Sequence, residues 1–227
     1  MNTEELAKRV GEDLIIRAGA DLSGLNLREV DLSGGDLRGV DFTGANLGWA
    51  NLAKANLTGA NFIGANLANA RLEGAYLKGA AFSGANATAV DFRDADIREV
   101  NFKDAILFTA KLNNADLSDS DLSNADLKYA DLRFASLTNG YFVKVNFKYA
   151  NLGNAVLDYA DFTKANFSWA NLYKANFGNS DLTEANLFSA NCEGAGFEGA
   201  ILKNTSLVNA ELIGASITQE QLKAAIY

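Results

Sequence analysis

The chain has 227 residues with a formal net charge of −8, no histidine, no proline and a single cysteine. The absence of histidine removes the commonest general base and the commonest neutral metal ligand, and one cysteine cannot form an internal disulfide. The negative charge opposes binding to nucleic acid or anionic lipid, so we expect a protein partner that is basic or that normally holds nucleic acid.

The first residues predict a short amphipathic helix at 2–10. Glu4 and Glu5 suit the positive end of a helix, and Gly11 can terminate it. Leu6 and Val10 fall on one face, which we expect to cover the N-terminal end of the domain that follows.

No targeting or membrane segment is expected. The N-terminal residues lack the apolar run of a secretory signal, and no stretch approaches the length of a membrane span. We therefore expect a cytoplasmic protein that does not contact membranes.

A period of five residues begins at residue 20. Leu or Phe occupies nearly every fifth position from Leu22 to Ile217, with Ala87 and Cys192 among the exceptions. A small residue, usually Ala, lies two positions before each, and Asn or Asp usually lies between them. This period matches neither the helical repeat of about 3.6 nor the strand repeat of about 2.

A short extended piece followed by a corner explains the period, and four such pieces close a square coil of 20 residues. Coils stacked as parallel strands about 4.8 Å apart would make ten coils and a rod about 48 Å long. The Leu or Phe would fill the interior, and the Asn or Asp would face outward and bond the backbone of the corner.

The motif Ala-(Asp/Asn)-(Leu/Phe)-X-X resembles the pentapeptide-repeat family over residues 20–217. The resemblance implies an all-β fold, a right-handed quadrilateral parallel β-helix. We predict a single domain over 1–227 with short capping helices at both ends: an N-terminal cap at 1–19, repeats at 20–217 and a C-terminal cap helix at 218–227. Thr218 and Gln221 have the spacing of a helix capping box.

The second residue of each corner changes character along the chain. Between Gly24 and Gly84 it is usually Gly, which favours type II turns because Gly adopts positive φ without strain. Between Ala89 and Ser189 it is never Gly. We therefore expect a different turn, resembling type I, in the second half of the rod.

An aromatic corner is the first candidate interaction surface. Aromatic residues spaced by 20 should stack on successive coils with their side chains outward, and Lys128 and Lys148 flank them. Such residues are typical of interface hot spots, although stacking that only stiffens the corner is the alternative. The candidate residues are Phe108, Tyr129, Tyr149, Trp169 and Phe188.

Aliphatic residues near the C-terminus form the second candidate surface, a contact that would join two copies of the chain as a homodimer. Coverage by the terminal helix alone is the alternative. The candidate residues are Ile201, Val208, Ile213, Ile226 and Tyr227.

An acidic stripe on one side of the rod is the third candidate surface, formed by Asp21, Asp41, Asp121, Asp161 and Asp181. The quinolone-resistance members of the family that the chain resembles are acidic, dimeric DNA mimics that bind DNA gyrase. The resemblance therefore implies an alternative function as a DNA mimic directed at a type II topoisomerase.

An enzymatic function is the weakest interpretation. The sequence contains no phosphate-binding Gly-rich loop, no nucleophile elbow and no metal-ligand spacing, and Cys192 occupies an interior position. We predict no catalytic residue, no cofactor and no metal site. The leading interpretation is a non-enzymatic scaffold that binds a protein partner along its rigid surface.

Overall fold

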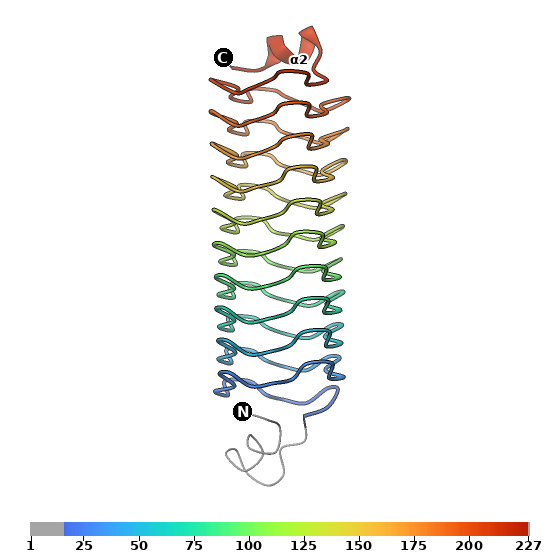
Figure 1. The fold of residues 1–227 in the computed structure, drawn as a ribbon, viewed down its shortest axis with the longest axis vertical. Helices are drawn as coiled ribbons and strands as arrows, with labels where there is room; N and C mark the ends of the chain where they lie inside the picture. Colours follow the sequence, from blue (N-terminus) through green and yellow to red (C-terminus); the bar gives the residue numbers. More distant parts are fainter. Residues whose placement is uncertain (1–15, 227) are drawn as a thin grey trace.

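The computed structural model describes residues 16–226, which form a straight rod of stacked coils (Figure 1). Parallel β-bridges join residues 20 apart, beginning with Asp21 and Asp41 and continuing on all four sides of the coil. Each strand contributes only isolated bridges, because the chain turns again after every five residues. The predicted 20-residue coil is therefore confirmed. The predicted helix at 2–10 lies outside the described residues.

Every backbone N–H of a typical repeat has a hydrogen-bond acceptor. Three N–H groups bond the neighbouring coils, one closes the turn, and the first corner N–H donates to the side chain of the preceding Asn or Asp. In one repeat the donors and acceptors are Asn46 N to Leu25 O (2.9 Å), Leu47 N to Asn66 O (2.7 Å), Trp49 N to Ala68 O (3.0 Å), Ala50 N to Leu47 O (2.9 Å) and Gly48 N to Asn46 Oδ1 (3.2 Å). An unpaired backbone N–H would cost free energy, which explains why a short polar side chain that accepts this hydrogen bond recurs along the rod.

The interior is filled by the side chains of the five-residue period. Leu57, Phe102 and Leu152 are fully buried, as are nearly all their equivalents. Four Phe rings stack on one side of the interior, with centroid separations of 4.9 Å (Phe42 to Phe62), 4.4 Å (Phe62 to Phe82) and 4.7 Å (Phe82 to Phe102). Because the rings and the aliphatic side chains fill the square cross-section, the core is continuous along the axis.

The backbone conformation at the corners contradicts the turn type that we predicted for the second half of the rod. The second corner residue has φ between +52° and +72° at every fifth position from Gly19 to Gly214, whether or not it is Gly. A type I turn needs negative φ at this position, so the turn resembling type I that we expected between Ala89 and Ser189 does not occur. The N–H of this residue donates to the next coil, as Ala89 does to Phe108 O at 2.8 Å, and stacking therefore imposes one corner geometry throughout.

Helix α2 (Gln219–Ala224) follows the last coil, at the red end of the rod in Figure 1. The predicted capping box is present, because Thr218 Oγ1 accepts the Gln221 N–H at 3.2 Å and Gln221 Oε1 accepts the Thr218 N–H at 2.9 Å. Gln221 Nε2 also donates to Phe197 O at 2.6 Å, which ties the helix to the rod. Leu222 packs against the core, but α2 has no fully buried residue, so it covers the end only partly.

Cys192 takes the place of an interior Leu and is fully buried. Burial, with a smaller contribution from Glu211, raises the pKa of its thiol to about 12. Because the thiolate is the reactive form, this cysteine is chemically inert in the folded rod.

We predict that Ala89→Gly stabilises the protein. The substitution relieves the left-handed backbone strain of a non-Gly residue, about 1–2 kcal/mol, against an entropy cost of about 0.5–1 kcal/mol. Urea unfolding should show a net gain of about 0.5–1 kcal/mol. The control Ala85→Gly, at an inward position with ordinary backbone, should lose stability; a loss in both variants would contradict the strain argument.

Thiol labelling provides a test of the interior. Native protein at pH 8 should react with a disulfide reagent only at the rate of global unfolding, because Cys192 is buried and protonated. In denaturant, where the pKa returns to about 8.5, labelling should be complete within minutes. Rapid labelling of the native protein would contradict the burial of Cys192.

The raised pKa of the folded thiol also predicts that the free energy of unfolding declines above about pH 9, because the thiol of the unfolded chain ionises first.

Candidate interaction surfaces

The five predicted aromatic side chains form one unbroken column along a corner of the rod. Consecutive members are in ring contact, with centroid separations of 5.6 Å (Phe108 to Tyr129), 5.0 Å (Tyr129 to Tyr149), 6.4 Å (Tyr149 to Trp169) and 5.6 Å (Trp169 to Phe188). The central three rings stack face to face, and the two Phe rings meet them edge-on. We call these five residues the aromatic column.

The aromatic column is open to solvent. Tyr129 is 47% exposed, Tyr149 40% and Trp169 50%, although each stacks on a neighbour. Because ring faces are used in stacking, the column presents ring edges and phenol hydroxyls outward. Lys128 and Lys148 place their Nζ atoms 5.1 Å from the ring centroids of the adjacent Tyr residues, within range of a cation–π interaction.

The five predicted acidic residues lie on one side of the rod, since Asp21 bridges to Asp41 and Asp161 to Asp181. The column between them contains Asn61, Ala81, Asn101 and Tyr141, which divide the charge into separate groups. Each of these carboxylates accepts the N–H two residues later.

Asp121 is also neutralised by an ion pair. Partial burial raises its pKa, but Lys103, with its Nζ 2.9 Å from Asp121 Oδ2, and hydrogen bonds from Ser123 together hold that pKa below the ordinary value. This ion pair neutralises one of the five carboxylates of the stripe, as the position of Lys103 on the same side of the rod leads us to expect.

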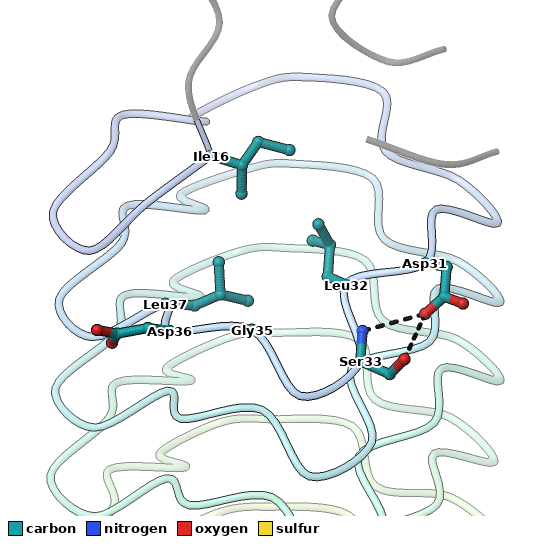
Figure 2. A pocket seen from close by; sticks show the side chains of 7 residues that line it. All are labelled: Ile16, Asp31, Leu32, Ser33, Gly35, Asp36 and Leu37. Atoms are coloured by element: carbon teal, nitrogen blue, oxygen red, sulfur yellow. Dashed lines mark hydrogen bonds between the residues drawn. The ribbon is translucent and has the colours of Figure 1, made fainter. Parts of the chain in front are cut away.

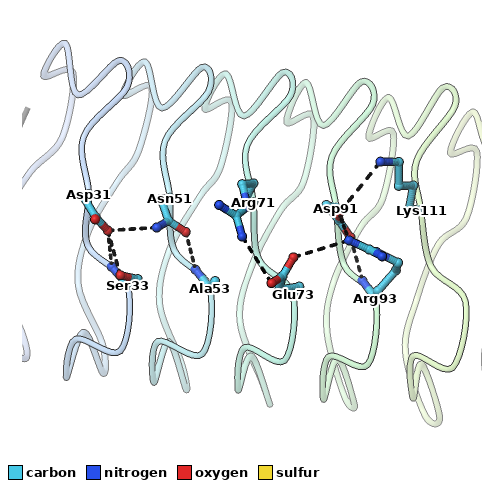
Figure 3. A network of polar contacts seen from close by, with 9 residues as sticks. All are labelled: Asp31, Ser33, Asn51, Ala53, Arg71, Glu73, Asp91, Arg93 and Lys111. Carbon is cyan, nitrogen blue, oxygen red and sulfur yellow. Dashed lines mark hydrogen bonds and ion pairs between the residues drawn. The ribbon is translucent and has the colours of Figure 1, made fainter.

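A chain of ion pairs crosses successive coils on another wall of the rod (Figure 3). Arg93 pairs with Asp91 at 2.7 Å and with Glu73 at 3.4 Å, and Arg71 and Lys111 extend the chain at either end. Burial raises the pKa of Asp91, but hydrogen bonds from Arg93 outweigh it and keep the pKa low. The charges on this wall are thus satisfied within the protein.

A hollow of about 350 Å³ lies near the N-terminal end of the rod (Figure 2). Its apolar wall is formed by Ile16, Leu32 and Leu37. Its polar groups already have partners: Asp31 Oδ1 accepts the Ser33 hydroxyl at 2.7 Å, and Asp36 pairs with Arg38 at 2.7 Å. The hollow therefore brings no reacting group together.

The predicted dimer residues surround the C-terminal end of the rod rather than forming one patch. Ile213 is 76% exposed, Ile201 and Ile226 are also exposed, and Val208 is half-buried. Tyr227 lies outside the described residues. The interior side chains Leu212 and Ile217 of the last coil are also only partly buried.

Sequence reasoning missed a second group of aromatic residues at the next corner. Phe134 is 59% exposed, and Tyr173 lies two coils further along with Lys174 Nζ 5.1 Å from its ring centroid. These residues occupy adjoining corner positions and are not spaced by 20, so a search for one aligned column does not find them. Among residues 16–226 there is no cluster of metal-ligating side chains and no helix long and apolar enough to cross a membrane.

Comparison with known proteins finds solved structures with similar sequences and a similar fold. The chain is 29% identical to HetL, a pentapeptide repeat protein involved in heterocyst differentiation regulation from the cyanobacterium Nostoc sp. strain PCC 7120. The match covers 100% of this chain and 94% of HetL, with a TM-score of 0.52. No curated protein sequence matches the chain.

Two other solved structures are more distant. A thylakoid-lumen pentapeptide repeat protein from Arabidopsis thaliana is 26% identical with a TM-score of 0.35, and the match covers 49% of this chain and 70% of that chain. QnrB1, a plasmid-mediated fluoroquinolone resistance protein, is 18% identical with a TM-score of 0.30, and the match covers 91% of this chain and 93% of that chain.

A family model of pentapeptide repeats matches in overlapping segments from residue 18 to residue 219, namely 18–44, 41–79, 65–104, 105–142, 141–179 and 180–219. Together with the 20-residue coils and the filled interior, this match shows that the chain belongs to the pentapeptide-repeat family, whose members form right-handed quadrilateral β-helices.

Proposed function

We propose that the protein is a non-enzymatic interaction module that presents the aromatic column of its rigid rod to a protein partner. The observation that carries this proposal is the exposure of the column: about half of the surface of Tyr129, Tyr149 and Trp169 faces solvent although all three rings are stacked. Contiguous exposed aromatic surface is typical of protein-binding sites.

The strained backbone of the aromatic column favours a role in binding a partner over a role that only stiffens the corner. The three central residues of the column all have φ of +62°, a conformation that costs a bulky residue about 1–2 kcal/mol. Within residues 16–226 no coil has Gly at this corner, but Asn69, Ala89 and Ser189 occupy the same position in other coils with the same positive φ. Since the rod folds with these smaller residues there, stiffness does not require aromatic residues, and their presence at strained positions fits a contact role.

The interior gives no support to catalysis. The side chains that face inward are almost all apolar and fully buried, and the few buried polar groups are hydrogen-bonded within the rod. Ser120, for example, accepts the Val100 N–H at 3.0 Å and donates to Ile97 O at 2.8 Å.

DNA mimicry directed at gyrase has weaker support. B-DNA carries one negative charge per about 1.7 Å of its axis. Residues 20–217 have a net charge of −7, so a rod about 48 Å long carries one charge per about 7 Å, and the interrupted stripe and the Lys103–Asp121 pair lower the local density further. The aromatic column therefore remains the better-supported contact surface.

We further propose that the C-terminal end of the rod joins two copies of the chain. The last coil leaves Leu212 and Ile217 partly exposed, α2 buries none of its residues fully, and Ile201, Ile213 and Ile226 surround this end. In a twofold dimer the same patch of each copy meets its counterpart, so an apolar end can be covered by the same end of a second copy.

The double variant Tyr149→Ala/Trp169→Ala tests the aromatic column. We expect the free energy of unfolding to fall by about 1.5–4.5 kcal/mol, since the variant removes three ring contacts that contribute about 0.5–1.5 kcal/mol each. Affinity capture from host extract should lose the partner that the wild-type protein retains. Trp49→Ala, at an exposed aromatic position of the same corner outside the column, is the control and should retain it. A large loss of thermal stability with capture unchanged would support stiffening instead.

Light-scattering mass measurements test the C-terminal contact. We expect wild-type protein at the mass of two chains and Ile213→Asp at the mass of one, because a charge cannot be buried unpaired in an apolar interface. Ile63→Asp, an exposed aliphatic position far from this end, should remain at two chains. A single-chain wild type, or a two-chain Ile213→Asp variant, would disprove the contact.

A further inference from the structure

One wall of the rod is bordered by exposed or half-buried aromatic residues on both sides. It consists of residues 131–135, 151–155 and 171–175, and its outward residues include Asn151 and Asn171. The aromatic column lies along one corner of this wall, and Phe134 and Tyr173 lie along the other. We call it the asparagine wall.

The asparagine wall is locally basic in an acidic protein. Lys128, Lys148 and Lys174 lie at its two corners, each with its Nζ 5.1 Å from the ring centroid of the adjacent Tyr. Within residues 16–226 none of these three lysines forms an ion pair, whereas Asp131 is neutralised by Arg133 at 2.6 Å. The wall therefore offers three lysines that form no ion pair with the described residues, beside apolar ring edges. Nearer the N-terminus on the same wall, the ion pairs around Asp91 and Glu73 leave no comparable excess of positive charge.

The hydrogen-bonding groups at the centre of the wall are already engaged. Asn171 Nδ2 donates to Asn151 Oδ1 at 3.1 Å, and the same Oδ1 accepts the Gly153 N–H at 3.2 Å. Asn171 Oδ1 accepts the Tyr173 N–H at 3.1 Å. The backbone of each coil bonds the coils above and below, so the wall has no free strand edge.

This arrangement discriminates between kinds of partner. An extended peptide binds a sheet by adding a strand at a free edge, which this wall does not offer. An α-helix satisfies its own backbone and needs only side-chain contacts. Stacking of a sugar or nucleobase needs free ring faces, and the central faces of the aromatic column are occupied.

The dimensions also fit a helix. The three extended residues of one wall span about 10 Å, close to the diameter of an α-helix with its side chains, about 10–12 Å. Successive coils lie about 4.8 Å apart and successive helical turns about 5.4 Å, so acidic residues one turn apart meet Lys128 and Lys148 on adjacent coils.

We propose that the asparagine wall binds an acidic amphipathic α-helix of a partner protein, laid parallel to the rod axis. Its apolar stripe contacts the ring edges at the two corners, and its Asp or Glu side chains meet Lys128, Lys148 and Lys174. This inference rests on the proposed function and names the class of partner that the aromatic column serves.

Photo-crosslinking tests the proposal with p-benzoylphenylalanine as the probe. The probe replaces Tyr149 at one corner of the wall and Tyr173 at the other, where an aromatic ring is already present. A third variant carries it at Lys144, which lies on the same coil as Tyr149 but at a different corner. After irradiation in host extract, we expect the first two variants to crosslink to one acidic, amphipathic segment and the Lys144 variant not to do so.

A synthetic peptide of the crosslinked segment then tests the charges. Its helicity by circular dichroism should rise on binding, and its affinity should fall with added salt. The variant Lys128→Glu/Lys148→Glu/Lys174→Glu should weaken binding by about tenfold or more, whereas Lys144→Glu should leave it within about twofold.

The outcomes separate the two proposals. A crosslinked segment that is basic, extended or insensitive to the triple charge reversal would overturn the helix while leaving the aromatic column as a protein contact. No crosslink from position 149 or 173 above the level at 144 would overturn both.

Discussion

Most corners of the rod are stabilised by one hydrogen bond that the backbone cannot make for itself. Four of the five N–H groups in a repeat find backbone acceptors, and the fifth, at the corner, finds the side-chain oxygen of Asn or Asp two residues earlier. Repeats with another residue at this position, such as Ala81, Ile106 and Val156, continue the same coil without this bond, so it stabilises most corners but is not required at each one. Because the polar side chain must lie next to its own corner, it is directed outward and the adjacent Leu or Phe inward. Where the bond is present, it orients the polar side chain outward while the adjacent apolar side chain fills the interior.

Much of this could be predicted from the sequence, because the determining interactions are local and repeated. The positions of Leu57, Phe102 and Leu152 inside the rod follow from the period alone, and so does the stacking of Tyr129 on Tyr149. The corner geometry could not be predicted in the same way. Residue preferences favoured another turn at positions such as Ala89, but the bond from its N–H to the coil above fixes positive φ whatever the side chain.

The surfaces were predicted less completely, because they depend on pairs of residues from different coils. The position of Lys103 beside the acidic stripe follows from the period, and Lys103 does pair with Asp121. By contrast, Tyr173 and Lys174, at the corner beyond the aromatic column, are not repeated 20 residues apart and were not predicted as a surface. Among the charged residues of the rod, the distinction that matters is between those paired internally, as around Asp91, and the three lysines of the asparagine wall that are not.

The four-sided coil also limits how such a protein can change in length. Inserting or deleting one residue would turn later interior side chains toward solvent unless a bulge at a corner absorbed the change, since the inward position recurs at every fifth residue. Gain or loss of one complete repeat would preserve the interior but rotate everything beyond it by a quarter turn. Trp169 would then leave Tyr149, and the two aromatic borders of the wall would separate. Only changes of whole 20-residue coils keep the faces aligned, so the outer surface constrains insertions more strictly than the core does.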